Sequence, residues 1–97
     1  MSDTVFYRKE GLITADMDGE TVMMDIETGK YYNLGRTGGD IWKNLENHHT
    51  VDRIVDEMME IYDVERAECE KETKSFLTQL IDAGLAFTKR NEDTEIP

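Results

Sequence analysis

The acidic residues between Thr14 and Asp25 have a spacing that suggests cation binding. In the fragment TADMDGETVMMD, Asp16, Asp18, Gly19 and Asp25 resemble positions three, five, six and twelve of an EF-hand calcium loop. However, Thr14 would occupy position one, and position twelve lacks the usual Glu. The flanking residues also alternate as in strands instead of helices. A plain hairpin turn at Asp18-Gly19 is the better interpretation.

Two histidines and one cysteine are the other side chains that suggest metal or nucleophilic chemistry. His48 and His49 have no cysteine or third histidine at the spacing of a structural zinc site, which favours a loop between helices. Cys69 lies among glutamates, including Glu68 and Glu70, whose negative charge disfavours the reactive thiolate. We therefore expect neither a metal site nor a catalytic thiol.

The glycines of the fragment GRTGG, followed by Asp40, raise the possibility of a phosphate loop. Gly35, Gly38 and Gly39 match neither G-x-x-x-x-G-K-[ST] nor G-x-G-x-x-G, and no βαβ context precedes them. A connection from a strand to a helix is the better account. With no defensible pair of acid and base elsewhere, the sequence predicts a protein that is not an enzyme and needs no cofactor.

Length and charge favour a binding module. Ninety-seven residues make one small domain with a modest core. The formal charge of −11 disfavours nucleic acid as a partner, because Lys and Arg supply most of the affinity for phosphates. From Asp52 to Glu72 there are nine acidic residues against three basic ones. These form either a solvated helical face or a surface that steers a cationic partner.

The sequence also indicates a compartment. Cys69 is the only cysteine, which excludes an intramolecular disulfide and suits a reducing environment. No apolar run approaches the roughly 18 residues that span a bilayer, and the start MSDTVFYRKE lacks the apolar core of a signal peptide. We expect a cytoplasmic protein.

The segment LITADMDGETVMMDIETGKYYNL predicts a meander of three antiparallel strands, with turns at Asp18-Gly19 and Thr28-Gly29. Residues 1–10 show no clear period and are expected to be a flexible lead-in, and residues 88–97 a polar tail, which leaves a folded domain over 11–87. Alternation defines the faces of the first two strands: Ile13, Ala15 and Met17 share one face, as do Val22, Met24 and Ile26, with Met23 and Asp25 opposite.

After Leu34 the period changes to that of helices. A short first helix is predicted from near Thr37 to Asn47, and Thr50 is the expected N-cap of a second helix. A third begins near Glu65 and ends at Gly84, after which Leu85 and Phe87 return to the core. The apolar stripes are Ile41, Trp42 and Leu45; Val51, Ile54, Val55, Met58, Ile61 and Tyr62; and Thr73, Phe76, Leu77, Leu80 and Ile81. The order predicts an α+β fold of winged helix-turn-helix type.

Two adjacent tyrosines distinguish the third strand. Tyr32 shares the face of Leu34 and should point inward, so that Tyr31 and Asn33 face outward. The strand lies at an edge of the sheet, and Lys30 is its only charged residue that would discourage pairing with another strand. Its unpaired backbone groups are either covered by the third helix or the N-terminal segment, or free to accept a peptide strand. The broad apolar face of the third helix favours a peptide slot.

The ordered combination of DIETGKYYNLGRTGGDIW, TVDRIVDEMMEIYDV and FLTQLIDAGL resembles the PqqD family. Its members are recognition elements that bind the leader peptides of ribosomally made, post-translationally modified peptides. The resemblance covers residues 11–87. The fragment ADMDGETVMMDIETGKYYNLGRTGGDIW is most similar to the small stand-alone leader-binding proteins of lasso peptide pathways.

The resemblance implies that a leader peptide binds as an antiparallel strand against the third strand, in a cleft with the third helix. The residues that would form the backbone edge are Lys30, Tyr31, Tyr32, Asn33 and Leu34, and those that would form the pocket wall are Thr73, Phe76, Leu77 and Leu80. Glu72 and Asp82 would meet basic leader residues. The implied partners are the precursor, a separate transglutaminase-like cysteine protease that removes the leader, and a cyclase.

Two other classes of function compete with this one. A winged-helix transcription regulator would share the fold, but the charge of −11 opposes the approach of phosphates. A small hydrolase that uses Cys69 would need the thiolate that its neighbours disfavour.

Overall fold

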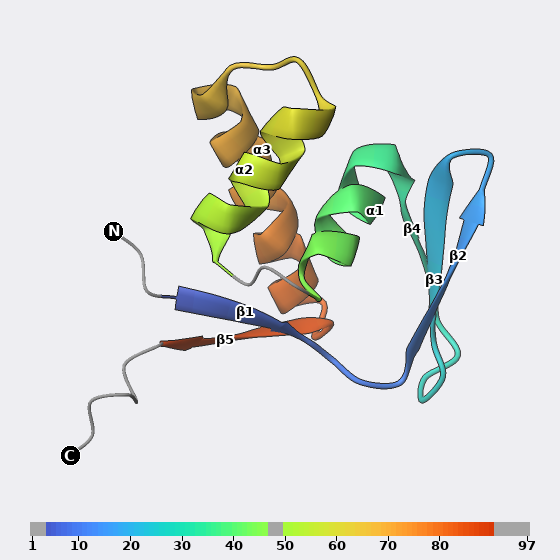
Figure 1. The fold of residues 1–97 in the computed structure, drawn as a ribbon. Helices are drawn as coiled ribbons and strands as arrows, with labels where there is room; N and C mark the ends of the chain where they lie inside the picture. Colours follow the sequence, from blue (N-terminus) through green and yellow to red (C-terminus); the bar gives the residue numbers. More distant parts are fainter. Residues whose placement is uncertain (1–3, 47–49, 91–97) are drawn as a thin grey trace.

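The computed structural model describes residues 4–46 and 50–90. Figure 1 shows a sheet beside three helices, with a second ribbon of strands below the helices. The α+β, winged helix-turn-helix layout predicted from the sequence is confirmed. Its elements are β1 (Thr4–Arg8), β2 (Leu12–Met17), β3 (Glu20–Asp25), β4 (Tyr31–Leu34), α1 (Gly35–Asn44), α2 (Val51–Ile61), α3 (Arg66–Asp82) and β5 (Ala86–Arg90).

The meander is a three-stranded antiparallel sheet in the order β2-β3-β4. Its first turn is the predicted one: Asp18 and Gly19 both have positive φ, 56° and 84°, as a two-residue hairpin turn requires. In the register of the sheet, Ala15 lies opposite Val22, and Met23 lies opposite Tyr32. Strands β2 and β4 are therefore the edges of this sheet, and the position of β4 at an edge is as the sequence predicted.

The first ten residues differ from the expectation of a lead-in without regular structure. Thr4–Arg8 form β1, which pairs antiparallel with β5 along its whole length, from Thr4 opposite Arg90 to Arg8 opposite Ala86. The partner strand lies about 80 residues later in the sequence, so no local sequence pattern predicts the pairing. Leu85 is buried as predicted, but Phe87 is 53% exposed on this ribbon and does not return to the core.

The alternation of β3 is as predicted, and the structure shows which face is inside. Thr21, Met23 and Asp25 are buried against the helices, while Ile26, which follows the strand, is 57% exposed. Helix α1 lies directly on this inner face. A Cβ at Gly39 would clash with the Thr21 side chain, so only a glycine permits so close an approach.

The helices follow their predicted stripes except at Ile61 and Ile81, which are 57% and 37% exposed, and the helix ends differ slightly from the prediction. Helix α1 begins two residues before Thr37, directly after β4, and ends at Asn44. Thr50 caps α2 as predicted, because its hydroxyl accepts the backbone N–H of Arg53 at 3.3 Å. Helix α3 ends before Gly84, whose φ of 76° is the left-handed conformation expected after a helix.

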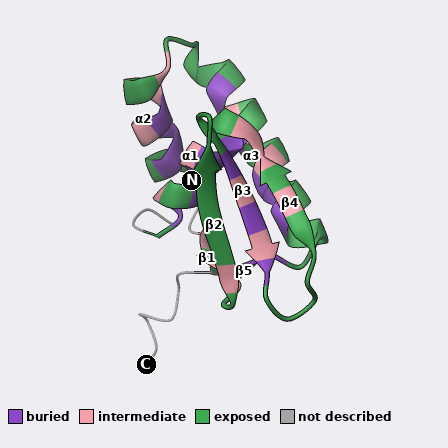
Figure 2. Cartoon of the chain, turned by 90° about the vertical axis from the view of Figure 1, so that its right-hand side faces the viewer, coloured by how far each residue is buried: buried purple, intermediate pink, exposed green. Residues whose placement is uncertain are grey.

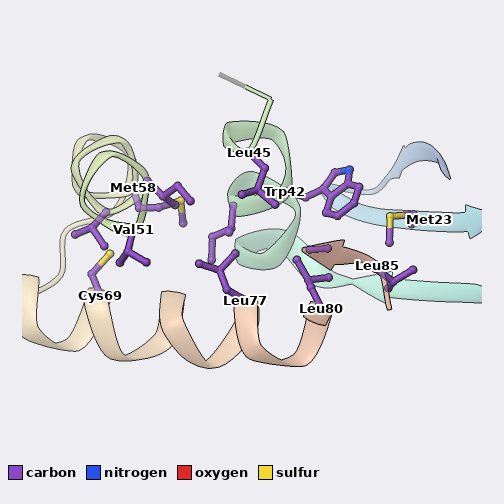
Figure 3. Packing of buried hydrophobic residues seen from close by; sticks show 13 residues of the cluster. Met23, Trp42, Leu45, Val51, Met58, Cys69, Leu77, Leu80 and Leu85 are labelled. Carbon is purple, nitrogen blue, oxygen red and sulfur yellow. The ribbon is translucent and has the colours of Figure 1, made fainter. Parts of the chain in front are cut away.

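The core lies between the three helices, β3 and the start of β5 (Figure 3). Leu77 and Leu80 of α3 point toward α1 and α2, and Met23 closes the side next to the sheet. The buried apolar residues are Met23, Ile41, Trp42, Leu45, Val51, Ile54, Val55, Met58, Cys69, Leu77, Leu80, Leu85 and Ala86.

Arg8 joins the β1–β5 ribbon to α1. Its guanidinium donates hydrogen bonds to the carbonyl of Trp42 at 2.6 and 3.2 Å and lies 4.8 Å from the centre of the Trp42 ring. Partial burial lowers the pKa of Arg8, with Glu46 acting in the opposite direction. The contact satisfies a carbonyl near the end of α1 and fixes the ribbon against the helices.

Candidate peptide-binding site

The free edge of β4 is the feature around which the site is built. Strand β4 pairs with β3 on one side, and no strand in residues 4–46 or 50–90 pairs with its other side. The N-terminal segment, which was one of the two expected covers for this edge, pairs with β5 instead. Among the described residues, the edge is therefore open to an added strand.

The register decides which backbone groups face outward. The N–H of Asp25 donates to the carbonyl of Lys30 at 2.9 Å, so the groups of Lys30 point toward β3. Because backbone groups alternate sides along a strand, those of Tyr32 also point to β3, and those of Tyr31 and Asn33 point to the open edge. The edge thus offers two N–H donors and two carbonyl acceptors.

The side chains of β4 divide as the sequence predicted. Tyr31 is 72% exposed on the outer face, while Tyr32 and Leu34 are half-buried and pack against the core. Asn33 is exposed, and its side-chain oxygen accepts the N–H of Gly35 at 2.9 Å. Lys30 is exposed beside the strand. Asn33 therefore closes the junction between β4 and α1 without covering the edge.

The four predicted wall residues of α3 lie at different depths. Thr73, Leu77 and Leu80 are 1–3% exposed and belong to the core, because α3 packs against α2 and β5 as well as α1. Phe76 is only partly buried and packs on the outside of the core. Whether the three buried residues touch a peptide stays a prediction, and Phe76 is the one among the four with accessible surface.

Phe76 lies against the first half of α1. A Cβ built on Gly38 would stand 2.7 Å from the Phe76 ring, so the ring occupies the space that a side chain at this position would need. The missing side chain lets α3 approach the helix that directly follows β4.

A small cavity opens beside the start of α1. It has a volume of about 110 Å³, and it is lined by Thr37, Ile41, Met58, Tyr62, Val64, Glu68, Cys69, Glu72 and Thr73. The Tyr62 hydroxyl donates to the Asp40 carboxylate at 2.6 Å, and this hydrogen bond, with burial, raises the pKa of Tyr62. The cavity is mostly apolar, with two glutamates among its lining residues.

A second hollow runs along α3 beside Phe76. It has a volume of about 390 Å³ and is lined by Glu68, Lys71, Glu72, Ser75, Phe76 and Gln79. Sequence reasoning named Phe76 and Glu72 but missed the other four, and it missed Thr37 and Gly38 of α1. Residues 68, 72, 75 and 79 are spaced as one stripe of a helix, next to the predicted apolar face. This spacing is the sequence signal that could have identified the lining of the hollow.

A partly buried ion pair holds the sheet to the connector from β1. The Lys9 ammonium lies 2.6 Å from the carboxylate of Asp25, which is itself buried and also accepts the N–H of Glu27. The hydrogen bond between the two side chains raises the pKa of Lys9 and lowers that of Asp25. The contact fixes the end of β3, and with it the start of β4, relative to the ribbon.

The remaining candidates for chemistry are not assembled into a site. Asp16 lies 3.4 Å from the Lys43 ammonium, and Asp25 pairs with Lys9, so the calcium-like spacing forms a hairpin as predicted. In residues 4–46 and 50–90 no three potential ligands gather around a metal position. Cys69 is buried, with its sulfur 4.0 Å from the Thr73 hydroxyl. His48 and His49 lie outside the described residues.

No helix in the part of the chain that the structure describes is long and apolar enough to cross a membrane. The domain boundaries at residues 10 and 88 stay a prediction, although β1 and β5 extend regular structure past both.

Comparisons with known proteins agree with this geometry. The family model described as coenzyme PQQ synthesis protein D (PqqD) matches residues 20–86. The structure of TbiB1 in complex with the TbiA(beta) leader peptide is similar at 30% identity, covering 82% of this chain and 93% of that chain with a TM-score of 0.73. A lasso peptide synthetase B1 complexed with the leader peptide is similar at 26% identity, covering 84% and 96%, with a TM-score of 0.73. None of the curated proteins matches the chain.

Proposed function

Because the chain belongs to the PqqD family, we propose that it binds the leader peptide of a ribosomally made precursor by adding it as a strand to β4. Both similar structures carry a leader peptide. The observation that supports this mode of binding is the open edge of β4, at which the backbone groups of Tyr31 and Asn33 point outward. We propose as the contact region the same nine residues that the resemblance implies, which are Lys30, the four residues of β4, and Thr73, Phe76, Leu77 and Leu80 of α3.

The energetics suit a carrier that later releases its peptide. Four backbone hydrogen bonds contribute about 1 kcal/mol each, and an apolar leader side chain buried on Phe76 adds about 2 kcal/mol. Ordering the peptide and bringing two molecules together oppose this gain. A second or third anchored side chain then brings the dissociation constant to the micromolar range or below.

The cavity beside α1 is the proposed place for one such anchor. A strand antiparallel to β4 runs with its N-terminal part toward Gly35 and the first turn of α1, where Thr37 lines the cavity. Its mostly apolar lining suits an apolar leader side chain. A neighbouring basic leader residue would meet Glu72, a contact that contributes about 0–1 kcal/mol because the carboxylate is exposed.

In this proposal the chain acts without catalysis, as a carrier that presents the leader to other proteins. These are a leader peptidase of the transglutaminase-like cysteine protease class and a cyclase, both expected from the sequence resemblance. A cytoplasmic location is expected from the single buried cysteine. The buried position of Cys69 also disfavours it as a nucleophile.

The test is a series of synthetic leader peptides, each with one N-methylated backbone amide. The peptides copy a leader of the class bound in the similar structures, beginning with that of TbiA(beta), and their affinities are measured by fluorescence anisotropy. A strand directs every second N–H to its neighbour, so we expect losses of about fivefold or more at alternate positions and little effect between them. Equal affinities at all positions would exclude strand addition.

Amide NMR of the labelled protein locates the bound strand. We expect the leader to shift the signals of Tyr31, Asn33 and Phe76, with those of the exposed Ile61 and Phe87 as internal controls. Shifts confined to the β1–β5 ribbon would reject this site.

A further inference from the structure

Side chains on the outer face of the three-stranded sheet form rows that cross its strands. Figure 2 looks onto this face, with the helices behind it. Ile13 of β2 lies opposite Met24 of β3, and Met24 lies opposite Tyr31 of β4. All three line a shallow hollow of about 260 Å³, and we call them the apolar row. The row ends at the open edge of β4 with Tyr31, which is 72% exposed.

The next row along the sheet ends in a polar side chain. Ala15 lies opposite Val22, and Val22 lies opposite Asn33 of β4. The side chain of Asn33 is already engaged, because its oxygen accepts the N–H of Gly35 at 2.9 Å and its amide donates to the Glu20 carboxylate at 3.4 Å. At the open edge the outer face therefore presents an aromatic ring and, two residues further along β4, an amide.

A strand added to β4 would extend both rows by one residue. Residues directly opposite each other in an antiparallel pair have their side chains on the same face. The leader residues opposite Tyr31 and Asn33 would therefore point to the outer face, and the residue between them would point inward with Tyr32. We call these three residues the leader triplet. Because the leader runs antiparallel to β4, its first residue lies opposite Asn33 and its third lies opposite Tyr31.

Charges at the open edge differ between the two outward-facing positions. Lys30 directly precedes Tyr31 and is exposed, so it disfavours a basic residue at the third position of the leader triplet. Glu20, which is bonded to Asn33, disfavours an acidic residue at the first position. A polar, non-acidic first residue and an apolar third residue suit both the side chains and the charges of this edge.

Two further cations, Lys43 and Arg36, belong to α1 but contact the other side of the sheet. The Lys43 ammonium lies 3.4 Å from the carboxylate of Asp16 on β2. The Arg36 guanidinium lies against Gly19, in the turn that joins β2 to β3. Both charges are thus placed next to β2 or its turn, whereas Lys30 and Glu20 are those that act on outward-facing leader residues at β4.

We propose that the side chain of Tyr31 determines specificity for the leader, and that β4 prefers a triplet in the order polar, apolar, and aromatic or β-branched. This inference rests on the proposed function, because it takes the leader to be the strand on β4. In strand addition the backbone hydrogen bonds form with any sequence, so a preference has to come from side chains. Aromatic rings pair favourably with aromatic and β-branched cross-strand neighbours, and the ring of Tyr31 offers such a pairing to the third residue.

The register of the bound leader is assigned without using its side chains. The backbone groups of Tyr31 and Asn33 point to the open edge, so the leader residues opposite them donate their N–H groups to β4. An N-methyl group at either residue removes such a hydrogen bond, whereas one at the residue between them does not. Two sensitive positions that are two residues apart therefore identify the first and third residues of the leader triplet.

The experiment is a double-mutant cycle between Tyr31 and the third residue of the leader triplet. The starting probe is the TbiA(beta) leader peptide, whose third triplet residue is made phenylalanine, valine, serine or lysine. Tyr31→Thr removes the ring but keeps a residue that favours strands, and Tyr31→Phe keeps the ring. Phe87→Thr is the matched control, because Phe87 is also an exposed aromatic residue of a strand, at 53%, and lies on the β1–β5 ribbon. Fluorescence anisotropy measures affinity, and circular dichroism checks the fold.

The wild type should bind the phenylalanine and valine peptides about three- to fivefold more tightly than the serine peptide, and the lysine peptide should not bind more tightly than serine. Tyr31→Thr should lose most of this preference, while Tyr31→Phe and Phe87→Thr should keep it. The same exchange at the first triplet residue should not favour phenylalanine over serine. Equal affinity of the wild type for all four peptides, or a preference that survives Tyr31→Thr, would show the proposal to be wrong.

The outcome separates this inference from the proposed function. If the wild type binds none of the leader peptides, the proposed function fails and the inference fails with it. If N-methylation causes losses at alternate positions but the third residue shows no coupling to Tyr31, strand addition stands and only the role of the Tyr31 side chain is rejected. If N-methylation has no effect at any position, the leader is not an added strand, and both are rejected.

Discussion

The helical body and the three-stranded sheet use their apolar residues in opposite ways. In the body, α2 and α3 bury Ile54, Met58, Leu77 and Leu80 against one another and turn acidic residues to water. In the sheet, β3 buries Met23 on one face, while the other face leaves Ile13 and its neighbours exposed. The body is closed by its own side chains, whereas the sheet has an exposed outer face and, among the described residues, two edge strands, β2 and β4, that lack a second strand partner.

This difference separates stability from recognition within one small chain. The core that holds the fold lies mostly in the body, so the sheet can keep unpaired backbone groups and exposed apolar side chains without losing its place. Two of the contacts that join the sheet to the rest are the close approach of Gly39 to Thr21 and the ion pair between Asp25 and Lys9. Substitutions in the body, at the junction and in the sheet should therefore differ in kind as well as in size.

The largest effect on stability is expected from the body. Leu77→Ala removes a side chain that is 1% exposed and should lower the free energy of unfolding by about 3 kcal/mol, through lost burial and the cavity left behind. Ile13→Ala on the sheet should cost less than about 0.5 kcal/mol. Urea titration followed by circular dichroism measures both, and equal losses would remove the contrast between the two regions.

The next effect lies at the junction, where two neighbouring glycines form a matched pair. Gly39→Ala drives a Cβ into the side chain of Thr21 on β3 and should destabilise the protein by about 1–3 kcal/mol, despite the better helix propensity of alanine. Gly38→Ala meets only the Phe76 ring, which can turn aside. It should leave stability nearly unchanged and alter leader affinity, measured by anisotropy. The reverse assignment would contradict our account of the junction.

A smaller effect at the junction depends on pH. The lowered pKa of Asp25 means that its charge stabilises the fold above the unfolded-state value, near 4, and that this contribution is lost as pH falls through the folded-state pKa. Asp25→Asn keeps an acceptor for the Glu27 N–H but loses the charge opposite Lys9. We expect a lower Tm for the variant at pH 7 and a difference that shrinks toward pH 3. A constant difference would argue against the ion pair.

The smallest effect comes from one hydroxyl in the body. Tyr62→Phe removes the 2.6 Å hydrogen bond to Asp40 and should lower the free energy of unfolding by about 1 kcal/mol. Tyr31→Phe, on the exposed face of the sheet, is the control and should be neutral within about 0.5 kcal/mol. Chemical denaturation of both variants tests this, and a larger loss at Tyr31 than at Tyr62 would reverse the comparison.

The sequence by itself determined the elements whose signals are local. Asp18-Gly19 predicts a hairpin because both residues tolerate positive φ, and Thr50 predicts a helix start because its hydroxyl can accept a nearby N–H. Alternation along β4 also placed Tyr32 inward and Tyr31 outward. These features depend on residues within a few positions of one another. The inference that the edge of β4 binds a leader peptide came from the resemblance to the PqqD family.

Only the tertiary structure decided what depends on distant partners. The pairing of β1 with β5 joins segments about 80 residues apart, so the first ten residues carried no readable period. The same holds for burial on α3: Thr73 and Leu77 belong to the apolar stripe with Phe76, but the first two are buried in the core, while Phe76 is only partly buried beside Gly38. Periodicity states which residues share a face, and the packing of other elements decides whether that face meets the core, water or a partner.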